Sequence, residues 1–75
     1  MLVIRFFDFD QKHVFQTKRF PNRQIHAKMR CASAILTLRP EIGGYMIYEV
    51  IGNDLIPYHP FNGQPRYERG KTIRL

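Results

Sequence analysis

The chain has 75 residues and a mass of 9.0 kDa. This length allows one small domain with a thin core and excludes a two-domain enzyme with a deep cofactor cavity. Twelve Lys and Arg residues against six Asp and Glu residues give a formal net charge of +6 and a pI near 10.0. One cysteine rules out an intramolecular disulfide. Every apolar run is far shorter than the ~20 residues of a membrane span, so we expect a cytoplasmic protein without a membrane segment.

The N-terminal third predicts a β-hairpin. Residues 1–9 are rich in β-branched and aromatic side chains, and residues 13–20 alternate well enough for a second strand. If Asp10 faces His13 across the turn, alternate side chains lie on opposite faces of the hairpin. One face then carries Leu2, Ile4, Phe6, Phe15, Thr17 and Arg19, and the other carries Val3, Arg5, Phe7, Phe9, Val14, Gln16 and Lys18.

A helix is predicted from about residue 23 to residue 38. Asn22 is a suitable N-cap, and Pro40 stops the helix. The apolar residues recur at intervals of four, three and four, which is the spacing of one buried helix face. These residues are Ile25, Met29, Ala32 and Leu36, with Ile35 on their flank. The far side collects Arg23, His26, Arg30, Ser33 and Thr37.

The C-terminal part predicts at least one more strand. We expect Gly43-Gly44 to reverse the chain, and residues 45–51 have the strongest strand composition. Residues 52–54 form a turn signal, and residues 55–58 can pair back as an edge strand limited by prolines. The prediction is an α+β domain over residues 1–63 in the order β-β-α-β-(β), with one helix on an antiparallel or mixed sheet. Residues 64–75 are expected to be a basic tail or a weak final strand.

Charge is distributed in three blocks along the chain. Residues 1–40 have a net charge of +6 (eight basic, two acidic), residues 41–65 of −3 (three acidic), and residues 66–75 of +3 (four basic, one acidic). If the fold gathers the basic blocks on one side, the molecule offers a surface for a polyanion. If the blocks neutralise one another, the charge serves only solubility.

Catalytic and metal-binding patterns are not evident in the sequence. Asp8 and Asp10 could act as a carboxylate pair, but their position favours a role in the hairpin turn. The three histidines lack the short spacing of zinc ligands, and Cys31 has no recognisable base. The glycines form no phosphate-binding loop before the helix. We therefore expect a non-enzymatic protein without metal or cofactor.

The positive signals concern binding to nucleic acid or to a nucleoprotein complex. Cations on the helix face can contact phosphates, aromatic rings on an open sheet can stack on bases, and a basic tail adds salt-sensitive affinity. The competing interpretation is an ordinary solvated surface. The candidate nucleic-acid-binding residues are Arg5, Lys18, Arg23, His26, Arg30, Arg66, Arg69 and Lys71.

The alternative function is binding to a protein, as an inhibitor or adaptor. Ten aromatic residues exceed what so small a core can bury, and exposed aromatics are favoured at interfaces. The partner would have an acidic surface, or would be a second copy joined edge to edge through residues 45–51 as a homodimer. The candidate interface residues are Tyr45, Tyr48, Tyr58 and Phe61.

The order of hairpin, single helix, Gly-Gly and hydrophobic strand over residues 13–51 loosely resembles small phage-encoded inhibitors of host machines. Examples are inhibitors of bacterial RNA polymerase and some anti-CRISPR proteins. The resemblance rests on element order and size, so it transfers no residue role. It implies an interaction protein.

Overall fold

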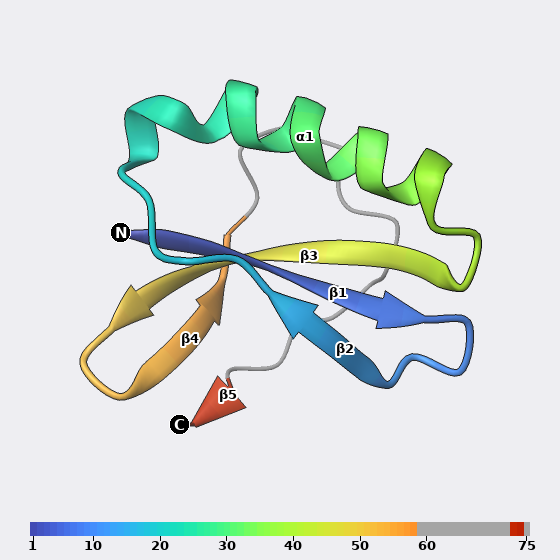
Figure 1. Ribbon diagram of the computed structural model, residues 1–75. Coiled ribbons are helices and arrows are strands. Elements are labelled where there is room, and N and C mark those ends of the chain that lie inside the picture. Colours follow the sequence, from blue (N-terminus) through green and yellow to red (C-terminus); the bar gives the residue numbers. More distant parts are fainter. Residues whose placement is uncertain (59–72, 75) are drawn as a thin grey trace.

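Strands that are antiparallel to their neighbours form one sheet, and a helix lies across one face of it (Figure 1). The computed structural model describes residues 1–58 and 73–74. Within these residues the strand order is β2-β1-β3-β4-β5. The elements are β1 (Leu2–Asp8), β2 (His13–Gln16), a 3-10 turn η1 (Asn22–Gln24), α1 (Ile25–Leu38), β3 (Ile42–Ile51), β4 (Asp54–Pro57) and β5 (Ile73–Arg74). The predicted α+β class and the β-β-α-β-β order are confirmed.

The N-terminal hairpin forms in a different register from the predicted one. Phe6 pairs with Phe15, two residues from the Thr17 that the sequence indicated. Because side chains alternate with a period of two, the two-residue offset keeps Phe6 and Phe15 on one face, as predicted. The predicted faces are wrong at both ends of the second strand, where the register shifts: His13 lies opposite Phe7, and Phe20 instead of Arg19 is buried in the cluster that contains Phe6. The rings of Phe6 and Phe15 stack at 4.5 Å on the helix side of the sheet. The turn is longer than expected because the Asp8 carboxylate accepts hydrogen bonds from the amides of Asp10 and Lys12, each 2.9 Å.

Beyond β2 the chain stays beside β1 but steps out of register. The Thr17 amide donates to the Ile4 carbonyl oxygen, and Leu2 and Phe20 exchange two backbone hydrogen bonds. Two residues, Lys18 and Arg19, therefore span the interval that one residue spans on β1, which is the geometry of a β-bulge. Both side chains are exposed in this bulge.

The helix follows the predicted range with a different start. Asn22 does not cap it, because residues 22–24 form η1 and no side chain caps either segment. Ile25 and Ala32 are buried against the sheet, and Met29, Ile35 and Leu36 pack beside them, as their spacing predicted. The helix ends at Leu38, after which Arg39 is extended.

The prediction that Gly43-Gly44 reverses the chain is wrong. The chain turns at Pro40–Glu41, and both glycines lie buried within β3. Gly44 is the register partner of Phe7 on β1. A residue without a side chain leaves room for the bulky ring opposite it, so these glycines act in strand packing and not in a turn.

Both faces of the central strands are buried. The helix-side cluster consists of Leu2, Ile4, Phe6, Phe20, Ile25, Ala32, Ile42 and Ile47. The second cluster consists of Val3, Phe7, Met46, Tyr48 and Leu55, with Val50 and Ile73 packed against it. Adjacent residues of β1 and β3 fall in different clusters because their side chains point to opposite faces. The sheet therefore has no open face at its centre.

Two predictions about sheet edges are wrong. β3 is the central strand, paired with both β1 and β4, so it cannot join a second copy edge to edge. β4 is also paired on both sides, because Leu55 lies opposite Ile73 of β5. The two prolines were expected to confine β4 to an edge, but Pro57 lies two residues beyond the Leu55–Ile73 pair and does not prevent that pairing. Most of the predicted 64–75 segment lies outside the described residues.

Candidate nucleic-acid interface

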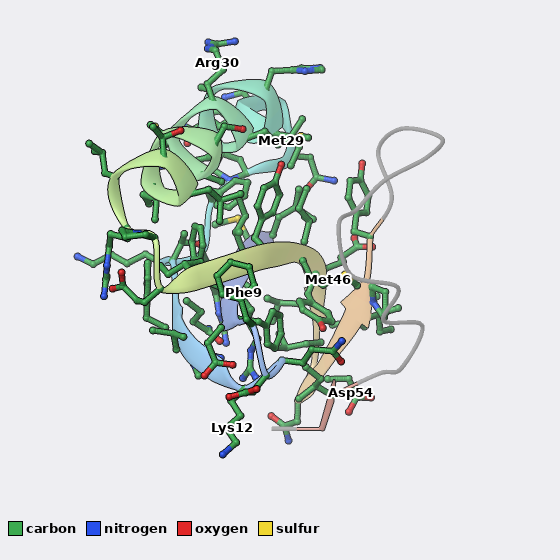
Figure 2. The ribbon with its side chains drawn as sticks, turned by 90° about the vertical axis from the view of Figure 1, so that its right-hand side faces the viewer. Phe9, Lys12, Met29, Arg30, Met46 and Asp54 are labelled. Atoms are coloured by element: carbon green, nitrogen blue, oxygen red, sulfur yellow. The ribbon has the colours of Figure 1, made fainter. Side chains whose placement is uncertain are left out.

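The face of the helix that points away from the sheet carries two arginines and two alanines. At about 100° per residue, these four residues lie opposite the buried stripe, at intervals of four, three and four. All four are exposed, and Figure 2 shows Arg30 pointing away from the sheet. We call them the outer helix ridge: Arg23, Ala27, Arg30 and Ala34. Arg23 belongs to η1 and places its charge just before the first turn of α1.

His26 flanks the outer helix ridge and is exposed. It therefore lies near Arg23 and Arg30, as the helical spacing predicted. Lys18 and Arg19 occupy the bulge that precedes Phe20 and leads into η1. Lys28 lies nearer the sheet, with its ammonium nitrogen 5.8 Å from the centre of the Phe20 ring. The β2–α1 connection and the helix are thus a continuous basic segment.

This segment carries no acidic residue from position 11 to position 40. It contains Lys12, Lys18, Arg19, Arg23, Lys28, Arg30 and Arg39. Arg39 forms an ion pair with Glu41 at 2.8 Å. The Arg39 guanidinium also lies 5.2 Å from the centre of the Phe15 ring. Arg39 is therefore engaged at the helix C-terminus, while Arg23 and Arg30 face solvent.

Arg5 lies apart from the outer helix ridge, on the face of the sheet that the helix does not cover. Its Nε donates a 2.8 Å hydrogen bond to Oε1 of Gln16 on β2. The rings of His13 and Phe7 meet nearby in a T-shaped arrangement, with 6.3 Å between centroids. Partial burial, together with the positive charge of Arg5, lowers the pKa of His13. The sheet therefore separates Arg5 from the helix cations that we expected it to act with.

The expected stacking surface of alternating cations and rings on the hairpin is wrong. Phe7 is only 6% exposed and belongs to the second cluster. Phe9 lies beyond the end of β1 and is 74% exposed. One exposed ring at a turn does not form a platform on which successive bases stack.

The tyrosines proposed for a protein interface are packed into the domain. Tyr48 is 1% exposed, so the prediction that it is a surface residue is wrong. Tyr45 and Tyr58 are half-buried against the helix-side cluster, and the Tyr45 ring lies 6.1 Å from that of Phe6. Strand alternation explains the arrangement, since Tyr45 and Tyr48 point to opposite faces. Phe61 lies outside the described residues.

The structure adds two cations that the sequence-based candidates omitted. Arg19 shares the bulge with Lys18. The only feature of the sequence that could have indicated its role is the pair of cations directly before the aromatic residue Phe20. Lys28 contacts Phe20, a pairing that no local spacing could indicate because it depends on how the connection returns to the helix. The three C-terminal candidates, Arg66, Arg69 and Lys71, lie outside the described residues.

The part of the chain that the structure describes shows neither a metal-binding cluster nor a membrane-spanning helix. No three His, Cys, Asp or Glu side chains there gather to hold a metal ion. None of the helices found there is long and apolar enough to cross a membrane. Comparison with protein-family models, with curated proteins and with solved structures finds no match for this chain.

Proposed function

We propose that this chain is a small non-enzymatic protein that binds nucleic acid. Its phosphate contacts come from Lys18 and Arg19 of the bulge and from Arg23 and Arg30 of the outer helix ridge. The observation that carries the proposal is the acid-free segment 11–40, which folds into one strand, one connection and the helix. Arg39 of this segment pairs with Glu41, whereas Lys18, Arg19, Arg23 and Arg30 have no acidic partner among the described residues. A surface of unpaired cations attracts a polyanion.

Two further observations support this function over its rivals. The Asp8 carboxylate accepts two backbone hydrogen bonds in the hairpin turn, which gives it a structural role and weakens the case for a carboxylate pair in catalysis. The tyrosines Tyr45, Tyr48 and Tyr58 pack against the two clusters, which weakens the case for an aromatic protein interface. The cations, in contrast, remain exposed.

The test is a fluorescence anisotropy titration of labelled oligonucleotides of mixed sequence, in duplex and single-stranded form. Phosphate contacts release counterions, so affinity for a duplex should fall about 10²-fold between 50 and 200 mM salt for about four contacts. If neither form binds at 50 mM salt, the proposal is wrong.

Matched variants locate the binding surface. Arg30→Gln removes one charge from the outer helix ridge, whereas Lys12→Gln removes one charge from the opposite end of the molecule (Figure 2). Arg30→Gln should weaken duplex binding and reduce the slope of log affinity against log salt by about 1. Lys12→Gln should change both much less. Equal effects of the two variants would show that net charge alone drives binding and would contradict the proposed surface.

A further inference from the structure

We infer that the ligand is duplex DNA, held with the outer helix ridge in the major groove, and not a single strand stacked on aromatic rings. This inference rests on the proposed function and names the ligand class of the same surface. Two independent features carry it, the burial of the aromatic rings and the shape of the ridge.

The first feature concerns single strands. Proteins that bind them combine cations with exposed aromatic rings on which successive bases stack. Here Phe6, Phe7, Phe20 and Tyr48 are buried in the two clusters. Of the Phe and Tyr rings in the described part of the chain, only Phe9 is exposed, and it belongs to the turn between β1 and β2. Among the described residues, the basic helix surface therefore has no row of Phe or Tyr rings beside it.

The second feature is the profile of the outer helix ridge. Ala27 and Ala34 alternate with the two arginines, and an alanine adds only a methyl group beyond the backbone. The helix can therefore approach another surface closely along this line. A helix with its side chains is about 10–12 Å in diameter, and the B-form major groove is about 12 Å wide, so the two fit.

Charge placement agrees with this fit. Arg23 of η1 and Arg30 of α1 are seven residues apart, which is about 10–12 Å along the axis at 1.5 Å per residue in the α-helix and 2.0 Å in the 3-10 turn. With the helix lying along the groove, this separation places the two guanidinium groups at different positions along the duplex, so each can reach a phosphate or a base edge of its own. The major groove of duplex RNA is deep and narrow and does not admit a helix, so the same ridge should distinguish DNA from RNA.

The experiment compares three probes of one sequence, a 20-base-pair duplex DNA, its single strand and the corresponding duplex RNA. We expect the full chain to bind duplex DNA at least about tenfold more tightly than either of the others, a difference of about 1.4 kcal/mol. If the single strand or the RNA duplex binds equally well or better, the groove assignment is wrong although nucleic-acid binding stands. If no probe binds, the proposed function itself fails.

Uncharged variants test the ridge directly. Ala34→Gln keeps the net charge and good helix propensity while placing a longer side chain on the ridge. It should weaken duplex DNA binding by about tenfold, because it holds the helix away from the groove. Ser33→Gln, on the exposed flank of the same helix, is the control and should have little effect. If Ala34→Gln leaves binding unchanged, or if Phe9→Ala abolishes it, the inference is overturned. Circular dichroism confirms that each variant folds.

Discussion

The ammonium group of Lys28 lies 5.8 Å from the centre of the Phe20 ring, and this contact joins the helix to the end of the hairpin. Phe20 is buried and exchanges two backbone hydrogen bonds with Leu2, so it is fixed to β1. Lys28 covers the ring from the helix. The contact therefore positions the connection that carries Lys18 and Arg19 relative to the outer helix ridge.

Replacing Lys28 with methionine should test this contact. The variant keeps a long apolar stem and removes the charge over the ring, so the free energy of unfolding should fall by about 0.5–1 kcal/mol. Lys18→Met is the matched control, because its exposed side chain lies in the bulge and contacts no ring among the described residues. Urea denaturation measures both. Equal changes in the two variants would mean that the ring contact contributes nothing.

Because both faces of β3 are buried, truncating either of two successive residues of this strand should reduce the free energy of unfolding by a similar amount. Met46→Ala opens a cavity in the second cluster and Ile47→Ala one in the helix-side cluster. Each should reduce the free energy of unfolding by about 2–5 kcal/mol. Ile51→Ala, at a half-exposed position, should cost less than about 0.5 kcal/mol. A tolerated Met46→Ala in the same denaturation experiment would show that one face of the sheet is effectively open.

Gly52 should resist substitution for a conformational reason. It is the first of two residues that connect β3 to β4, and its φ is +59°. A Cβ placed there meets no atom within 4 Å, so the cost of an alanine is backbone strain and not a clash. Gly52→Ala should lower the free energy of unfolding by about 1–2 kcal/mol, and Gly52→Asn by less, because asparagine tolerates this region. Thermal unfolding of the two variants provides the comparison.

His13 should make stability depend on pH below neutrality. Partial burial and the charge of Arg5 lower its pKa in the folded state. Between the folded and unfolded pKa values the unfolded chain binds more protons, so this contribution to stability falls as the pH drops below about 6.5. His13→Gln should lose this part of the pH dependence when urea midpoints at pH 7.5 and pH 5 are compared.

The effect of Arg5 on the pKa of His13 can be measured directly by NMR. Titration of the His13 ring should give a pKa below the ordinary histidine value in the wild-type chain, and Arg5→Gln should raise it. A pKa that does not respond to Arg5→Gln would show that the arginine charge does not reach the ring. Gln16→Ala is the control variant, because it removes the hydrogen-bond acceptor of Arg5 without removing a charge. It distinguishes the electrostatic effect of Arg5 on the pKa of His13 from an effect of altered hairpin structure.

Local patterns in the sequence were sufficient for the elements and for one face of the helix. The spacing of Ile25, Met29, Ala32 and Leu36 predicted the buried stripe, and Arg23 and Arg30 followed on the opposite side. The turn at Gly52 was also evident, because few residues other than glycine adopt its backbone conformation. These features depend on residues that are close along the chain, so a single segment contains the whole signal.

Strand order and the second cluster depend on contacts between distant segments, and only the tertiary structure decided them. Gly43-Gly44 had the composition of a turn, yet pairing of Gly44 with Phe7 places the glycines inside β3. Tyr48 is of a residue type that is common at protein interfaces, yet it is buried because β3 lies between β1 and β4. The sequence by itself determined the helix, its charged face and the basic character of the chain. Long-range strand pairing decided which aromatic rings are buried and which cations remain exposed. A single strand does not encode which strands lie on either side of it, so this information is absent from any one segment.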